Sequence, residues 1–419
     1  MKKIRLTLLI LISFSLFLTA CVPSSDSNEN GIADTSVAEI VEEMMTSEAQ
    51  KALETEQAAV TPTVAPTEKP TEPATSTPVP PTATVEPTAT PEIKAIGPDN
   101  FPVDVNPLTG LKVEDPEIMN RMPVLVKVPN YPAYGRPHGG LSAADIVFES
   151  WIGGGANRFM ALYYGQDSDY VWPIRSVRIM DPEVATLYSG ILVFSGGDVN
   201  KVLPKVIETL GNKYVMEGTT SGMFDNGRGD VTRLYVDTEL ITRDVQNRGI
   251  DPGEKPNLDG MVFNEIAPEG GQEASKVRFY INSGNIGDWV YDEESGKYLR
   301  WIEDANTFEM IPLLDRNTNE QLAFSNFIML YTPNIEIETQ LIDIKIWDNV
   351  NGRRAVIFRD GKAYEAIWKT PDRKSPIRFY DLDGNLFELK PGNTWIAITG
   401  ESTPETVDGT EWLYEFRMP

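Results

Sequence analysis

Six polar side chains in the first half of the chain are of types that bind anions or transfer protons. They are Asp145, Glu149, Arg158, Arg175, Ser176 and Arg178. A guanidinium group can donate two parallel hydrogen bonds to a carboxylate or a phosphate, so arginines that converge make an anion site. Carboxylates four residues apart lie on one face of a helix and could hold the arginine side chains in place. The spacing therefore predicts an arginine-rich cleft for a small anionic or glycan ligand.

The same residues also fit a purely structural interpretation. Buried arginine–carboxylate networks often stabilise a loop and bind nothing. Here such a network would hold the loop over 175–178 against a helix over 143–151. Both interpretations stay open at the level of sequence.

His138 offers a third possibility, because it lies in the loop before the expected helix. Oriented by Asp145 or Glu149, its imidazole could act as a base for Ser142 or Ser176. That arrangement would make the protein a cell-envelope hydrolase or transferase. The simpler interpretation is an exposed or packed histidine, since one histidine in a loop carries little information.

Strand and helix signals alternate in the part of the chain that carries these residues. Apolar runs predict strands, and capping residues predict helix starts; Ser142 and Asp145 resemble a capping box, and Asp181-Pro182-Glu183 is typical of a first helical turn. The expected strands are 123–128, 158–164 and 191–194, and the expected helices are 143–151, one from 181, 199–210 and 239–248. Residues 100–252 are therefore predicted to form an α/β-type domain. Ser195-Gly196-Gly197 is interpreted as a strand-to-helix turn rather than an anion site.

Hairpin signals dominate from residue 253 to the end. Asp360-Gly361 and Asp383-Gly384 each separate two apolar runs. Residues 253–419 are therefore predicted to form a mostly antiparallel β domain, and the whole chain is of the α+β class. Six tryptophans in strand-like runs either fill its core or stack a sugar or peptide: Trp289, Trp301, Trp347, Trp368, Trp395 and Trp412.

Composition excludes several classes of function. The formal charge of −25 makes nucleic acids poor partners, because binding them requires clustered cations. His138 is the only histidine and Cys21 the only cysteine, so no disulfide, histidine-rich metal site or cofactor is expected. The turn over 315–320 lacks the glycine of a calcium loop.

The amino-terminal residues predict export and lipid attachment. Lys2, Lys3 and Arg5 precede an apolar stretch over 6–18 that is too short to span a membrane stably. Leu18-Thr19-Ala20-Cys21 resembles the lipobox of bacterial lipoproteins. The resemblance implies that the signal peptide (1–20) is removed, that Cys21 carries a lipid with fatty acids such as palmitate, and that the protein is membrane-anchored outside the cytoplasm.

Residues 21–99 are predicted to be a disordered tether. Thr, Pro, Glu and Ala dominate 61–91, and proline at this density prevents helices and sheets. Asp26 to Asp34 resembles a calcium loop, although Val37 stands where an EF-hand needs glutamate; a plain polar linker is the alternative.

Several segments together resemble the YerB-like bacterial lipoproteins, a two-domain family of unknown function. The resembling segments are 106–110, 140–149, 158–162, 173–178, 361–368 and 389–396. One departure is Gly229-Asp230-Val231-Thr232-Arg233, where the family is expected to have Pro-His-Asn. The resemblance implies a lipid-anchored body of two domains and no established activity.

The favoured hypothesis is a non-enzymatic lipoprotein that binds an envelope protein or a small anionic or glycan ligand. Arg158, Arg175 and Arg178 are its expected anchors. The envelope hydrolase built on His138 is the alternative.

Overall fold

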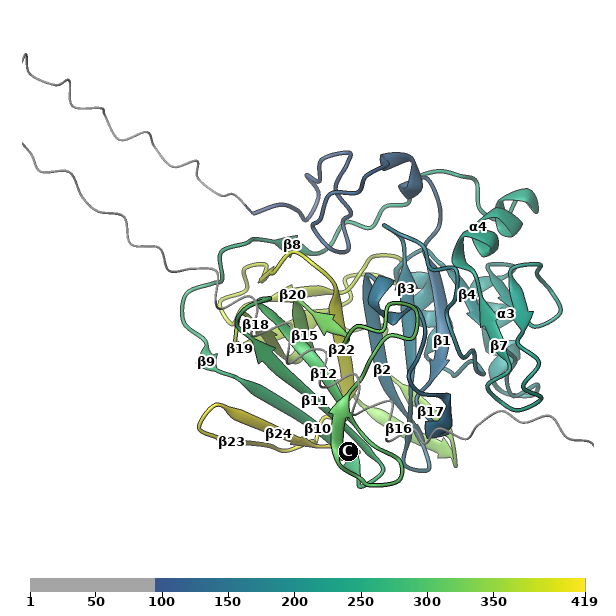
Figure 1. The fold of residues 1–419 in the computed structure, drawn as a ribbon. Coiled ribbons are helices and arrows are strands. Elements are labelled where there is room, and N and C mark those ends of the chain that lie inside the picture. Colours follow the sequence, from purple (N-terminus) through teal and green to yellow (C-terminus); the bar gives the residue numbers. More distant parts are fainter. Residues whose placement is uncertain (1–94, 419) are drawn as a thin grey trace, which may run out of the picture. The chain divides into compact units, whose positions relative to one another are not determined.

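The structure, a computed structural model, describes residues 95–418 (Figure 1). The predicted signal peptide, Cys21, the 26–34 loop and the tether up to residue 94 lie outside this range. Among the residues that it covers, no helix is long and apolar enough to cross a membrane. Ile96 forms a bridge with Phe263, so regular contacts begin before residue 100.

A sheet of eleven strands runs through the centre of the molecule. Its order is β20 (Arg378–Tyr380), β19 (Lys362–Lys369), β18 (Arg353–Arg359), β15 (Asn326–Tyr331), β22 (Thr394–Thr399), β2 (Ile146–Gly153), β3 (Ala156–Tyr163), β1 (Val124–Pro129), β4 (Ile191–Phe194) and β5 (Tyr214–Met216), with β9 (Gln272–Glu273) beside β19. The strand β2 pairs in parallel with β22, Phe148 opposite Ile396. This one sheet therefore joins strands from both halves of the chain.

A second sheet has seven strands and is built from the second half alone. Its order is β13 (Met310–Pro312), β12 (Lys297–Glu303), β11 (Asn285–Asp292), β10 (Lys276–Asn282), β24 (Glu411–Glu415) and β23 (Glu405–Asp408), with β14 (Ala323–Phe324) beside β12. Three strand pairs complete the β structure: β6 (Met223–Asp225) with β7 (Leu234–Val236), β8 (Val262–Phe263) with β21 (Glu388–Leu389), and β16 (Asn334–Glu338) with β17 (Leu341–Ile344).

Helices are few in residues 95–418: α2 (Asp181–Leu187), α3 (Val202–Leu210) and α4 (Thr238–Asn247). Each begins where the sequence predicts one to within three residues. Pro182 and two acids occupy the first turn of α2, and the Asp237 side chain accepts the Leu240 N–H at the start of α4. The chain is thus mostly sheet, with two domains and few helices.

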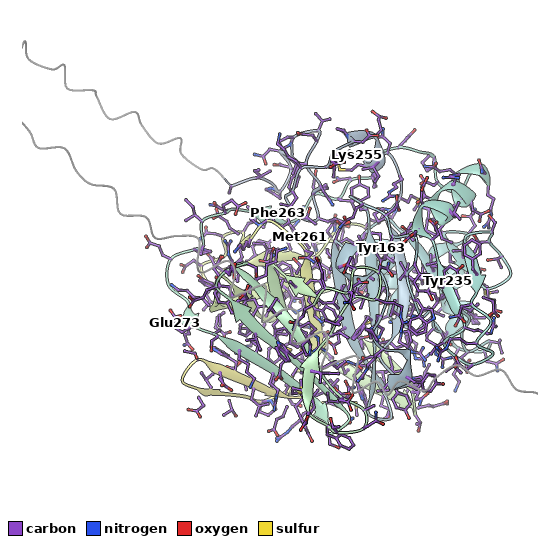
Figure 2. All side chains as sticks on the ribbon, in the orientation of Figure 1. Tyr163, Tyr235, Lys255, Met261, Phe263 and Glu273 are labelled. Atoms are coloured by element: carbon purple, nitrogen blue, oxygen red, sulfur yellow. The ribbon has the colours of Figure 1, made fainter. Side chains whose placement is uncertain are left out.

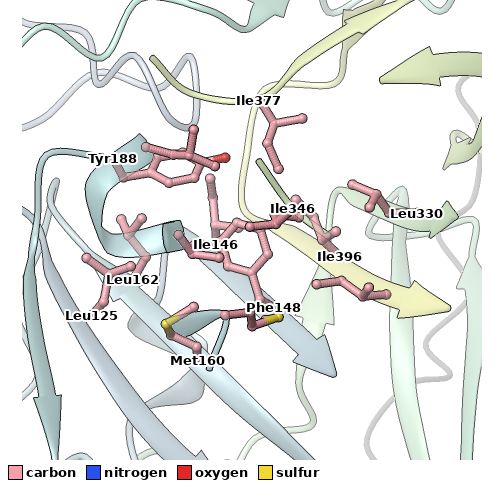
Figure 3. Close-up of a cluster of buried hydrophobic side chains, with 14 of the residues drawn as sticks. Leu125, Ile146, Phe148, Met160, Leu162, Tyr188, Leu330, Ile346, Ile377 and Ile396 are labelled. Atoms are coloured by element: carbon pink, nitrogen blue, oxygen red, sulfur yellow. The ribbon is translucent and has the colours of Figure 1, made fainter. Parts of the chain in front are cut away.

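The central sheet buries both of its faces, because side chains alternate along each strand. Ile146 and Phe148 of β2 pack with residues of α2, α3 and β17, whereas Val147 packs with Trp289 of the second sheet. Figure 3 shows the first of these cores, in which Leu125, Met160 and Tyr188 meet Leu330, Ile377 and Ile396. The two halves therefore share one hydrophobic core.

The halves are connected by residues 248–275, which leave α4, form β8 and reach β9. Figure 2 labels Lys255, Met261, Phe263 and Glu273 along this connection. Met261 and Phe263 are buried in the shared core, while Glu273 is exposed. The connection is therefore packed against the body at its middle.

The expected helix over 143–151 is wrong. Only a single 3-10 turn forms at Leu141–Ala143, and the strand β2 follows it. The capping side chains are used elsewhere: the Ser142 hydroxyl donates to Asp315, and Asp145 accepts the Tyr164 N–H. Ile146-Val147-Phe148, buried on both faces, favours a strand, so tertiary packing overrides the local helix signal.

The predicted β-hairpins have a mixed outcome. The strands flanking the turn at Asp360-Gly361 pair as expected, as β18 with β19, and β11 and β12 form a further hairpin at Ser295-Gly296. The segments flanking Asp383-Gly384 meet at an antiparallel bridge between Tyr380 and Leu386, and β21 beyond this bridge pairs with β8.

Candidate functional site

Asp145 lies immediately before β2 and is bound by three donors. Its Oδ2 accepts the N–H groups of Tyr164 at 2.6 Å and Gly165 at 3.0 Å, and its Oδ1 accepts Asn106 Nδ2 at 2.9 Å. Burial raises the pKa of the Asp145 carboxyl to about 6, against the effect of these donors. Its bonds connect β2 to the end of β3, so its role in the fold is structural.

Glu149 lies inside β2, on the face that meets the second sheet. Its Oε2 accepts Trp395 Nε1 at 2.9 Å and lies 3.8 Å from the Arg300 guanidinium, and its Oε1 accepts from Asn157. Burial raises the pKa of the Glu149 carboxyl. Its cationic neighbour is therefore Arg300, and the two predicted carboxylates do not hold the three predicted arginines.

Arg158, Arg175 and Arg178 come from two segments that meet at the end of β1. Arg158 is opposite Pro129 in the β3–β1 register, and the Arg175 N–H donates to the Lys127 carbonyl at 2.9 Å. The Arg158 side chain donates to the carbonyl of Ser176, between the other two arginines. The structure brings the three guanidinium groups together.

Burial, followed by the like charges of neighbouring guanidinium groups, lowers the pKa values of Arg158 and Arg178. Burial lowers the pKa of Arg158 to about 9, and the nearby Arg178 and Arg175 lower it further in the same direction. Burial also lowers the pKa of Arg178, with Asp181 opposing and Arg175 adding to the effect. Within residues 95–418, none of the three arginines has a carboxylate oxygen within 4.0 Å.

Two residues that the sequence did not single out complete the group. Lys127 is fully buried in β1, and its Nζ donates to Asp181 Oδ1 at 2.7 Å. Asp181, in the first turn of α2, also accepts the Arg178 N–H at 2.6 Å. We call Lys127, Arg158, Arg175, Arg178 and Asp181 the cationic cluster. A lysine inside the apolar run 124–128 was the signal that could have revealed it.

The cationic cluster retains donors without acceptors. The Nε atoms of Arg175 and Arg178 are buried, and no described residue accepts from them. The hydrogen bonds made by the three side chains go to carbonyls: those of Ser176 and Val177, and that of Val231 at 3.4 Å. A buried donor without an acceptor costs stability, so the cluster has unused capacity to bind an acceptor.

The backbones of Ser176 and of the turn at 195–197 lie beside the cationic cluster. Ser176 contributes its carbonyl to Arg158. The Val177 N–H donates to the Gly196 carbonyl at 2.9 Å, and the Ser195 N–H to the Arg175 carbonyl at 3.0 Å. The turn at 195–197 connects β4 to the approach of α3, as expected.

His138 is fully buried and far from a catalytic arrangement. Its Nε2 lies 2.7 Å from the Pro129 carbonyl oxygen, and its ring packs edge-on against Phe159. Burial lowers the pKa of His138 to about 3, helped by Arg136. Ser142 donates to Asp315, so the structure does not join His138 to the serines and carboxylates of the predicted hydrolase.

The other predicted features are placed as follows. Trp289, Trp368, Trp395 and Trp412 are buried in the cores, whereas Trp301 and Trp347 are only partly buried.

Asp315 forms a turn, where it accepts from the Gly140 and Asn317 N–H groups. In the described part of the chain no set of three or more His, Asp or Glu side chains is grouped to hold a metal ion.

Comparison with known proteins gives consistent matches over this body. Residues 108–251 match a family model described as "Protein of unknown function (DUF3048) N-terminal domain", and residues 276–396 match its C-terminal domain. The Bacillus subtilis (strain 168) protein named "Putative lipoprotein YerB" is 29% identical over 304 residues, which cover 70% of this chain and 85% of that protein.

A solved structure agrees with the sequence matches. The crystal structure of the YerB protein from Bacillus subtilis superposes with a TM-score of 0.56 at 25% identity, covering 70% of this chain and 96% of that one. The predicted family is thereby confirmed. The chain belongs to the YerB-like family of proteins that carry the two DUF3048 domains.

Proposed function

We propose that this protein is a lipid-anchored extracytoplasmic lipoprotein whose cationic cluster binds an anionic ligand. In this proposal Cys21 carries the lipid, and the tether ends before Ile96, which pairs with Phe263. The residues from there to 252 and residues 253–419 are the α/β-type and β-rich domains of the body. The lipobox-like residues 18–21 and the printed name of the Bacillus subtilis relative support the anchor. Mass spectrometry of the natural amino terminus tests it: an acylated Cys21 is expected, and an intact Met1 would refute the anchor.

The ligand proposal depends on one observation: four cations share a single carboxylate in a mostly buried place. Lys127 is 0% exposed and Arg158 is 6% exposed, and Asp181 alone opposes them. Uncompensated buried charge is costly, and a protein of formal charge −25 has carboxylates in excess. A charge imbalance of this kind is a feature of binding sites rather than of structural ion pairs.

The hydrogen-bond donors of the cationic cluster are suited to holding an anion rather than to catalysing a reaction. Guanidinium groups bind carboxylates and phosphates through paired hydrogen bonds. Among the described residues near the cluster, no nucleophilic side chain has an adjacent base. Ser176 contributes its backbone carbonyl, which accepts from Arg158. We therefore favour binding without catalysis.

Calorimetric titration of the purified protein with inorganic phosphate tests the ligand proposal. Arg175 is half-buried at the edge of the cluster, so Arg175→Ala should keep the fold and weaken binding about tenfold or more, as the loss of charge-assisted hydrogen bonds predicts. The matched control is Arg243→Ala, which removes an exposed guanidinium paired with Glu239 on α4. Unchanged phosphate affinity in Arg175→Ala, or no binding by the wild type, would reject the proposal.

A further inference from the structure

The charge of the cationic cluster restricts the class of anion it suits. Lys127 is paired with Asp181 at 2.7 Å, and burial lowers the pKa of its ammonium group. The guanidinium groups of Arg158, Arg175 and Arg178 are then three cations without a carboxylate oxygen within 4.0 Å among residues 95–418. A single carboxylate ligand would leave two of them uncompensated. A phosphate monoester carries about −1.5 to −2 charges near pH 7 and has three acceptor oxygens, so it compensates the excess better.

Two exposed apolar residues lie near Arg175, at the edge of the cluster, and a bare phosphate would not use them. Tyr134 is 53% exposed, and its hydroxyl is near enough to act on the charge of Arg175. Val231 is 44% exposed, and its carbonyl accepts from Arg175. An exposed aromatic ring and an exposed valine beside buried guanidinium groups form a surface for the organic part of a ligand.

Backbone packing fixes this rim relative to the arginines. An ideal Cβ on Gly135, next to Tyr134, would lie 3.2 Å from side-chain carbons of both Pro173 and Thr232. Pro173 leads into the Arg175–Arg178 segment, and Thr232 follows Val231. The backbone at Gly135 therefore packs closely against Pro173 and Thr232, so the segments that carry Tyr134, Arg175 and Val231 are neighbours in the fold.

Polar side chains surround the aromatic rim. Arg228 is exposed and Asp230 half-buried on the same loop as Val231, and Asp230 holds the loop by accepting from the Thr232 N–H at 2.7 Å. A sugar presents an apolar ring face together with hydroxyl groups, so it matches a tyrosine face with polar neighbours better than an acyl chain does.

We infer that the ligand is a sugar phosphate, with its phosphate monoester at the cationic cluster and its sugar ring against Tyr134. This inference rests on the proposed anion binding and specifies its chemistry. A sugar phosphate then binds more tightly than inorganic phosphate, and Tyr134 accounts for the difference.

The test compares four probes by calorimetry on the purified protein: inorganic phosphate, glucose 1-phosphate, gluconate and phenyl phosphate. The wild type should bind glucose 1-phosphate about tenfold more tightly than phosphate, and gluconate more weakly than either. Tyr134→Ala should bring glucose 1-phosphate to the affinity of phosphate and leave phosphate binding unchanged. Phe308→Ala, which removes an aromatic ring that is 59% exposed elsewhere, should change neither affinity.

Each of the other possible results of this titration refutes a named part of the inference or of the proposed function. Equal affinity for phosphate and glucose 1-phosphate in the wild type refutes the sugar site and leaves anion binding standing. If gluconate binds as tightly as glucose 1-phosphate, the argument that the charge of the cluster favours a phosphate monoester over a carboxylate is refuted. Phenyl phosphate binding more tightly than glucose 1-phosphate shows an apolar rather than a sugar partner and refutes the inference. Failure of all probes refutes the proposed function as well.

Discussion

Two buried groups of arginines in this molecule have opposite charge balance. The cationic cluster has four cations and one carboxylate. At the second sheet, another group pairs two arginines with two buried acids, and we call it the paired network: Arg136 with Glu303 at 2.9 Å and Arg300 with Glu149 at 3.8 Å.

The paired network has the properties of a structural element. Arg300 is 1% exposed and lies over the rings of Trp289 at 4.1 Å and Trp395 at 5.4 Å. Glu303 also accepts the Ile286 N–H at 2.9 Å. Arg300 Nε and Trp289 Nε1 are also buried without an acceptor among the described residues, but each guanidinium group of this network has a carboxylate partner. Its charge is compensated inside the protein, so this network needs no ligand. The two groups therefore differ in charge balance rather than in the number of buried arginines, and the different roles proposed for them rest on that difference.

The largest expected effect is the loss of a carboxylate from the paired network. Glu149→Gln leaves Arg300 buried without its acid, so the free energy of unfolding should fall by about 3–5 kcal/mol. Urea unfolding followed by circular dichroism measures it. Glu239→Gln, on an exposed pair with Arg243, should change stability by less than about 0.5 kcal/mol. Similar values for both variants would contradict the structural role of Glu149.

The next effect is a pH dependence caused by His138. Its pKa is about 3 in the folded protein and has an ordinary value near 6.5, so the unfolded chain takes up a proton first as pH falls. The contribution of His138 to stability is therefore full above pH 6.5 and is lost as pH falls towards 3, by about 4 kcal/mol. His138→Gln should remove that part of the slope.

Nuclear magnetic resonance checks the same prediction directly, because the chain has one histidine. The imidazole signal of the folded protein should not titrate between pH 8 and 5. A midpoint near 6.5 would mean that His138 is exposed to water, against the structure.

The smallest expected effect is an increase in the free energy of unfolding rather than a decrease. Arg158→Met removes one uncompensated charge from the cationic cluster, so the free energy of unfolding should rise by about 1–2 kcal/mol. Arg121→Met is the matched control: Arg121 is equally buried but paired with Asp167 at 2.7 Å, so its loss should destabilise the protein by about 3 kcal/mol. If Arg158→Met is destabilising to the same extent, the two groups do not differ as described.

The sequence predicted the strands β1, β3 and β4 and the starts of the three helices well, because these depend on local runs and caps. It failed at 143–151, where Ser142 and Asp145 imitate a capping box while binding Asp315 and Tyr164 instead. It also did not reveal that β2 pairs with β22, since that pairing joins residues almost 250 positions apart. Long-range pairing leaves no local pattern in one sequence.

The candidate site was predictable only in part for the same reason. Arg175 and Arg178 are close in sequence, and Arg158 marks a charged position in an apolar strand. The three arginines lie apart from Asp145 and Glu149 because the segment that follows Asp145 forms the strand β2 and not a helix. In this strand Glu149 accepts from Trp395 and does not reach the arginines. Lys127 and Asp181 belong to the cluster only through the packing of α2 against β1, which no spacing rule contains.

The central claim is that the cationic cluster is left short of negative charge because a ligand supplies it. Thermal unfolding of the wild type and of Arg158→Met, in phosphate and in chloride at equal ionic strength, tests this most directly. The account predicts that phosphate raises the melting temperature of the wild type by about 2–4 °C and leaves that of Arg158→Met unchanged. Equal responses of the two proteins to phosphate would contradict it.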